Sequence, residues 1–229
     1  MTALTFGSGD APLFGVYHPA TGVARARRAV LLCNPFGEEA IRAFRPFQKL
    51  AERFAAEGVA CLRFDYLGTG DSAGDDDLVS VKSMATSILT AHEELVDLSE
   101  AREIYWVGLR LGAWAALDAT ADIQPAGIFL WDPIRDGADY AAHLAALPAA
   151  GEEEALGFPV TEPLRAELQS GPAHGDDTVR RKLLATTPFL KTEPILPPPD
   201  EEWNSDDALN SFTMPMATIE LIVREVSGW

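Results

Sequence analysis

The chain has 229 residues, of which 47% are hydrophobic and 23% are charged, and its formal net charge is −17. A chain of this length and composition can bury a full core and is expected to form one domain. The strong negative charge argues against binding to nucleic acid and to anionic membrane surfaces, because both would repel it.

The first residues and the cysteine content suggest a compartment. Residues 1–7 contain no basic segment followed by an apolar one, so no signal peptide is expected. No stretch approaches the roughly 20 apolar residues that insertion across a bilayer requires. Two cysteines, Cys33 and Cys61, are too few for a disulfide framework. We therefore expect reduced thiols in a cytoplasmic protein.

Apolar runs alternate with helix-forming segments over the first 136 residues. A helix is expected between Glu39 and Gly58, because apolar residues recur there at helical spacing. This alternation predicts an α/β fold with a mostly parallel sheet flanked by helices. Strands are expected at 12–19, 29–33, 59–64, 104–107 and 127–131, a second helix at about 78–98, and the first helix's buried face at Phe44, Phe47, Leu50, Ala51 and Phe54.

The loops after the predicted parallel strands are expected to meet at one edge of the sheet. They are residues 34–39, 65–72, 108–112 and 132–136. Ligands of such sheets bind at the carboxyl ends of the strands. These four loops therefore hold the candidate site.

The pattern weakens after residue 136. We expect a single domain, 1–229, with its core strands and helices in 10–136, a cap-like or irregular region in 137–200, and a C-terminal connector and helix in 201–229. Helices are expected near 140–147, within 159–168 and at 217–226, and an acidic, proline-rich stretch at 196–202.

One strand-to-helix turn is the most informative motif. An apolar run ends at Gly108, Arg110 stands at the centre of the turn, and Gly112 opens a run of helix formers. Glycines two residues before and two after the central residue give the layout of a nucleophile elbow. They allow the sharp turn and the close packing of helix on strand behind it.

Three segments, 32–39, 63–72 and 108–112, resemble the α/β-hydrolase superfamily. The likeness is to a bacterial branch that includes exosortase-associated hydrolases and serine-aminopeptidase-like hydrolases, and it covers roughly residues 10–150. It implies an oxyanion-hole amide near Phe36, a second one at Leu111, and Arg110 at the nucleophile position.

The sequence departs from this family pattern in its chemistry. Arg110 cannot act as a nucleophile, because its guanidinium stays protonated and has no free lone pair. The C-terminal part looks shortened where an acid and a histidine should follow, and His174 is the only histidine after His143. The sequence therefore predicts a pseudoenzyme.

Arg110 has two interpretations. Beside the free amides of a helix N-terminus it could receive a carboxylate or phosphate. Alternatively, it could pair internally with Asp132, Asp65 or Glu38. A cation is disfavoured at a helix N-terminus, so in either case an anion is expected close by.

The other candidate residues are expected to have mainly structural roles. Cys33 is expected to be a core residue, Ser72 a turn cap, and Asp132 either an acid or part of a strand-end turn. The histidines lack ligand spacing, so no metal site and no cofactor are expected.

Three functions remain open at this stage. The first is a non-catalytic protein that binds a small anionic molecule or a protein partner. The second is a genuine hydrolase of esters, thioesters or amides with an unconventional catalytic set. The third is a structural partner that docks through its acidic tail. The first would use Arg110, Leu111, Phe36, Gly37, Asp65 and Asp132.

Overall fold

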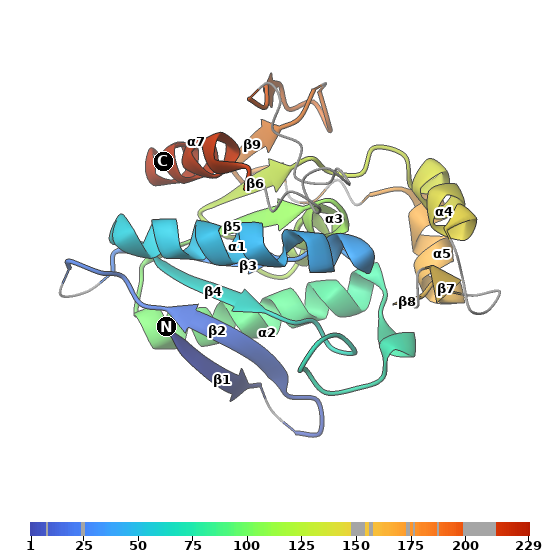
Figure 1. Ribbon diagram of the computed structural model, residues 1–229, viewed down its shortest axis with the longest axis horizontal. Helices are drawn as coiled ribbons and strands as arrows, with labels where there is room; N and C mark the ends of the chain where they lie inside the picture. Colours follow the sequence, from blue (N-terminus) through green and yellow to red (C-terminus); the bar gives the residue numbers. More distant parts are fainter. Residues whose placement is uncertain are drawn as a thin grey trace.

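A computed structural model of the chain describes residues 1–7, 9–23, 26–147, 154–155, 158–172, 175, 177–186, 188–198 and 214–229. In these ranges the chain folds around one large sheet with helices on both faces (Figure 1). The predicted α/β fold class is therefore confirmed. His174 and residues 199–202 of the acidic connector lie outside the described residues.

Eight strands of the described residues form the main sheet, in the order β1-β2-β4-β3-β5-β6-β9-β10. β2 pairs antiparallel with β1 and with β4, and all later neighbours pair in parallel. The strands are β1 (Thr2–Phe6), β2 (Leu13–His18), β3 (Arg28–Cys33), β4 (Ala60–Phe64), β5 (Glu103–Leu109), β6 (Gly127–Trp131), β9 (Arg181–Leu184) and β10 (Pro194–Ile195).

Helices α1 and α7 cover one face of the sheet, and α2 and α3 cover the other (Figure 1). Helices α4 and α5 and the small hairpin β7–β8 lie together beyond the carboxyl edge of the strands. The helices are α1 (Glu38–Ala56), η1 (Asp76–Leu78), α2 (Val81–Ser99), α3 (Leu111–Ala119), α4 (Gly137–Ala146), α5 (Glu162–Ser170) and α7 (Met216–Ser227), and the hairpin strands are β7 (Glu154–Ala155) and β8 (Phe158–Pro159).

The central strands are buried on both faces, which explains their continuous apolar runs. In β3, Val30 and Leu32 pack into the core under α1 and α7, while Ala29 and Leu31 pack into the core under α2 and α3. Successive residues of a strand point to opposite faces, so both sets must be apolar here. The sheet is thus the shared centre of two cores in one domain.

The first turns of α1 differ from the prediction. Phe47, Leu50 and Phe54 are buried as expected, but Phe44 is 59% exposed. Its ring instead lies 5.4 Å from the Arg63 guanidinium. Helical spacing identifies which side chains share a face, but not whether the sheet extends beneath that part of the helix.

The predicted cap-like region, 137–200, contains two kinds of structure. Its first part holds α4, the hairpin and α5, whereas β9 and β10 join the main sheet. The prediction is corrected for these strands. Residues 185–193 connect β9 to β10, fewer than the dozen or more usual between parallel strands.

None of the helices within the described ranges is both long and apolar enough to cross a membrane.

Candidate functional site

Arg110 stands at the apex of a sharp turn between β5 and α3. Its backbone has φ 53° and ψ −119°, a conformation that side-chain-bearing residues rarely adopt. A Cβ on Gly112 would lie 2.2 Å from the Asn34 carbonyl oxygen, and one on Gly108 would lie 2.6 Å from the Ala113 Cα. The predicted reason for both glycines, close packing of strand and helix behind the turn, is confirmed.

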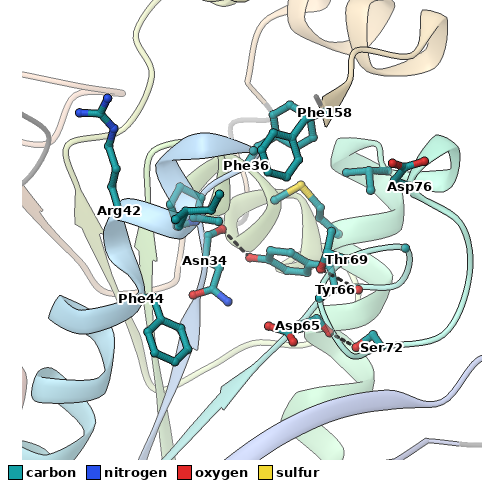
Figure 2. Close-up of a pocket in the computed structure, with 18 of the residues that line it drawn as sticks. Asn34, Phe36, Arg42, Phe44, Asp65, Tyr66, Thr69, Ser72, Asp76 and Phe158 are labelled. Carbon is teal, nitrogen blue, oxygen red and sulfur yellow. Dashed lines mark hydrogen bonds between the residues drawn. The ribbon is translucent and has the colours of Figure 1, made fainter. Parts of the chain in front are cut away.

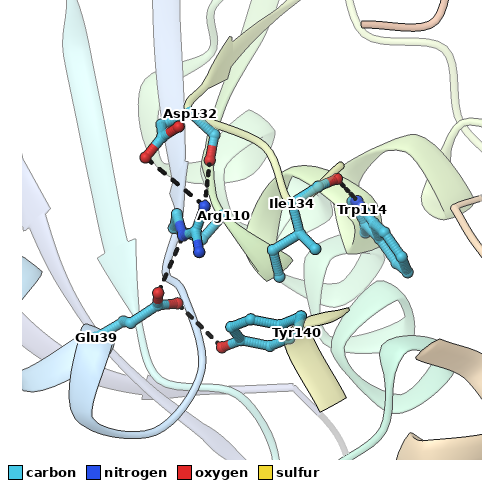
Figure 3. Close-up of polar contacts among 6 residues, drawn as sticks. All are labelled: Glu39, Arg110, Trp114, Asp132, Ile134 and Tyr140. Atoms are coloured by element: carbon cyan, nitrogen blue, oxygen red, sulfur yellow. Dashed lines mark hydrogen bonds and ion pairs between the residues drawn. The ribbon is translucent and has the colours of Figure 1, made fainter. Parts of the chain in front are cut away.

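The Arg110 guanidinium is held by groups of the protein itself (Figure 3). Its Nε donates a hydrogen bond of 3.0 Å to Glu39 Oε1. Its Nη1 lies 3.4 Å from the backbone oxygen of Asp132 and 3.7 Å from that residue's Oδ2. The Tyr140 hydroxyl donates to the other Glu39 oxygen at 3.0 Å, and its ring lies beside the guanidinium. We call Arg110, Glu39 and Tyr140 the apex cluster.

Burial and ion pairing together determine the pKa shifts of the apex cluster. Burial raises the pKa of the Glu39 carboxyl, and Arg110 and two hydrogen bonds only partly offset that increase. Burial alone would lower the pKa of Arg110, but Glu39 and Asp132 reverse the direction and raise it. Arg110 therefore remains a cation, and its charge is balanced inside the protein.

The partners of Arg110 differ from those predicted. Of the three carboxylates considered, Asp132 lies within ion-pair distance. Glu38 instead pairs with Arg42 one turn along α1, at 2.7 Å. The Asp65 carboxylate accepts a hydrogen bond from the Asp71 amide at 3.1 Å. The closest partner, Glu39, was not predicted, although a carboxylate in the first turn of a helix is favoured there.

A large cavity opens between the start of α1 and the loop after β4 (Figure 2). Its volume is about 1100 Å³. Of the predicted ligand-binding residues, Phe36, Gly37 and Asp65 line it, whereas Arg110, Leu111 and Asp132 are not among the described residues of its wall. We call this space the α1 cavity. The predicted residues therefore fall into two groups, one lining the cavity and one around Arg110.

The loop after β3 forms the boundary between the two groups. Gly37 caps α1 with φ 61°, and a Cβ there would lie 3.6 Å from the Phe158 ring. Phe36 packs edge-on against the same ring, at 6.3 Å between centroids. Leu111 is buried and begins α3, where backbone amides have no partner within the helix. The oxyanion-hole role of Phe36 and Leu111 stays a prediction.

Ser72 and Cys33 both have structural environments. The Ser72 hydroxyl donates to the Asp65 carbonyl at 2.6 Å and accepts from the Phe14 amide at 2.8 Å, so it fixes the glycine-rich loop to β2. Cys33 is fully buried, and burial raises the pKa of its thiol far above the ordinary range. These contacts agree with the structural roles predicted for both residues, a turn cap for Ser72 and a core residue for Cys33.

The sheet order, the strained turn after β5 and the helices on both faces define the α/β-hydrolase fold. No protein-family model matches the sequence, and no curated protein sequence matches it. Many solved structures match this chain, and three of them serve as examples. A structure of Est1E from Butyrivibrio proteoclasticus with ferulic acid bound superposes with a TM-score of 0.70 and 16% identity, over 98% of this chain and 100% of that one.

Two further structures match over a shorter length. The α/β hydrolase GrgF from Penicillium sp. sh18 has a TM-score of 0.61 and 18% identity, over 80% of this chain and 78% of its own. A putative hydrolase from Agrobacterium vitis S4 has a TM-score of 0.55 and 19% identity, over 80% and 77%. At such low sequence identities these structures show that the fold is shared. They do not indicate a shared function, which depends on the residues of the site.

Proposed function

We propose that this chain is a non-catalytic protein with the α/β-hydrolase fold, which acts by binding a partner. In this proposal Arg110 occupies the position where the fold carries its nucleophile. One observation supports it above all: the side chain at the apex of the turn is a guanidinium, held at 3.0 Å by the Glu39 carboxylate.

The chemistry of the apex supports a loss of catalysis. Nucleophilic attack requires a lone pair, which a guanidinium does not offer. The Ser72 hydroxyl is engaged in two hydrogen bonds within the protein, and the Cys33 thiol is fully buried, so neither is available as a nucleophile. The alternative, a genuine hydrolase with an unconventional catalytic set, would need a nucleophile elsewhere.

The apex cluster also argues against a small anionic ligand on Arg110. Such an anion would have to displace the Glu39 carboxylate, which Tyr140 holds from its other oxygen. The Asp132 carboxylate would repel it as well. Binding is therefore assigned to the α1 cavity, whose wall includes Phe36, Gly37 and Asp65.

The loss of catalysis is tested by covalent labelling and turnover. The wild type is exposed to a fluorophosphonate probe and to short p-nitrophenyl esters, next to a boiled sample and Arg110→Ala. We expect no labelling and no hydrolysis above the boiled control. Labelling of the folded protein, or turnover well above that control, would establish the hydrolase alternative.

The cytoplasmic location predicted from the sequence is part of the same proposal. Both cysteines are free and buried, in agreement with a reducing compartment. Fractionation of the source cells with an antibody against the chain tests the location. Recovery outside the cytoplasmic fraction would contradict it.

A further inference from the structure

The α1 cavity has an apolar floor and an apolar wall. Phe36, Tyr66, Val79 and Met84 are buried and form its inner surface. Ile41 and Phe44 on α1 are 65% and 59% exposed, although they line the same space. Large apolar side chains left this exposed beside a cavity are typical of a surface that another molecule covers.

The exposed rim of the cavity favours a chain segment over an enclosed small molecule. Pockets for small ligands usually have about 300–1,000 Å³ and bury most of the ligand. The α1 cavity, at about 1100 Å³, lies close to the upper end of that range, so its rim rather than its volume decides. Because Ile41 and Phe44 stand exposed at its rim, an occupant must extend beyond the cavity onto α1 to cover them.

The charges around the cavity favour a basic occupant. Asp65, Asp71, Asp75 and Asp76 line the side formed by the loop after β4, and the last three are exposed. Two arginines line the other side, and one of them, Arg42, is paired with Glu38 at 2.7 Å. Figure 2 shows Phe44 and the Asp65 carboxylate facing the same space from opposite elements.

We infer that the α1 cavity docks a segment of a partner protein in which aromatic or branched aliphatic residues stand next to lysine or arginine. The apolar side chains enter between Phe44 and Phe36, and the basic residues lie against Asp71, Asp75 and Asp76. Aromatic anchors in apolar pockets give most of the affinity of such interfaces, and rim charges contribute specificity and association rate. The inference rests on the proposed function, since it names the partner that this binding protein would take.

Selection from a phage-displayed library of random short peptides tests the inference. The full-length wild-type chain is the bait, and enriched peptides are synthesised and titrated by fluorescence anisotropy. We expect enriched peptides to combine apolar anchors with lysine or arginine. Phe44→Ala should weaken their binding about tenfold, because it removes the ring against which the peptide's apolar anchor packs. Asp75→Asn/Asp76→Asn should weaken it about threefold, with a smaller effect at high salt.

Matched variants separate the cavity from the rest of the surface. Leu98→Ala removes a partly exposed apolar residue of α2, and Asp10→Asn/Asp122→Asn removes two exposed carboxylates, all outside the cavity wall. Both should bind the peptides as the wild type does. Circular dichroism of each variant verifies that it is folded.

Three results would overturn the inference: no enriched peptide, enriched peptides that are acidic or lack an apolar anchor, or binding that both cavity variants leave intact. Hydrolysis is measured separately, so the two proposals can fail independently. Ester turnover would refute only the loss of catalysis, whereas a selection without cavity-dependent peptides would refute only the docking partner.

Discussion

Breaking the ion pair between Arg110 and Glu39 should cost stability, and the cost should depend on which partner remains. The pair is mostly buried, with side chains 21% and 14% exposed. Glu39→Gln leaves the Arg110 cation with only Asp132, at 3.7 Å. Arg110→Met leaves the Glu39 carboxyl in a buried site without a cation.

The size of the effect follows from this burial. Removing one partner of a fully buried pair costs about 3–5 kcal/mol. Residual exposure and the second carboxylate reduce this, so each single variant should lose about 2 kcal/mol. The double variant leaves neither the buried cation nor the buried carboxylate, and only the half-exposed Asp132 loses a partner. We expect it to lose about 1.5 kcal/mol less than the sum of the two single losses.

The effect of Arg110→Met should also grow with pH. Burial already raises the pKa of Glu39, and Arg110 is one of the groups that limits that rise. Removing Arg110 raises the pKa of Glu39 further, so the carboxyl stays protonated to higher pH in the folded variant. A folded-state pKa that is raised means stability is lost as pH rises through it. The variant should therefore resemble the wild type more closely at pH 5 than at pH 8.

Urea denaturation measures these changes. With a typical slope for a small protein, a loss of 2 kcal/mol moves the midpoint by about 1 M. Glu38→Gln is the matched control, since it breaks an i,i+4 pair with Arg42 and should cost at most about 0.5 kcal/mol. Additive single losses, or equal costs at pH 5 and pH 8, would refute the view that Glu39 balances Arg110.

Three other predictions follow from contacts already described. Gly112→Ala places a Cβ 2.2 Å from the Asn34 carbonyl oxygen. The free energy of unfolding should therefore fall by about 3 kcal/mol, measured as a lower denaturation midpoint. An unchanged midpoint would contradict the close packing at the turn. Tyr140→Phe removes the hydroxyl that bonds Glu39, and the same assay should show a loss of about 1.5 kcal/mol, which Glu39→Gln should largely abolish. His18 is buried, and burial lowers its pKa from 6.5 to about 4. The stability that depends on neutral His18 should therefore be fully present above pH 6.5 and be lost as the pH falls toward 4. An NMR titration of His18 with a midpoint near 6.5 would contradict this prediction.

The centre of the fold could be predicted from the sequence because its signals are local. The apolar runs of β3, β4, β5 and β6 are buried on both faces. Gly108 is required by a contact with Ala113, only five residues along the chain, whereas Gly112 is required by contacts with Cys33 and Asn34 at the end of β3. Strand, turn and helix therefore appear in the sequence in the order in which they appear in space.

The outer strands were missed because their local signals are weak. β1 buries only Phe6. β9 begins with Arg181 and Lys182, which look unsuited to a sheet. Lys182 is accommodated by Glu225 at 3.0 Å and by the ring of Trp229, groups more than 40 residues away. Such a partner cannot be read from the neighbouring residues.

The candidate site was predicted in part for the same reason. The four loops do follow strands of the sheet, as expected, but the sequence does not indicate which carboxylate reaches Arg110. Glu38 and Glu39 are adjacent, and the direction of each on the helix decides which one faces the turn. Tyr140 and Phe158 lie after residue 136, in the part of the chain where the sequence pattern indicates helices and strands only weakly.

The backbone of Arg110 has a consequence for how this fold can change. Its φ of 53° is imposed by the turn, and any residue with a Cβ meets the same conformational cost there. Exchanging Arg110 for another residue with a Cβ should therefore leave the turn and the sheet behind it in place. The chemical character of the apex can vary in this scaffold while the path of the backbone stays the same.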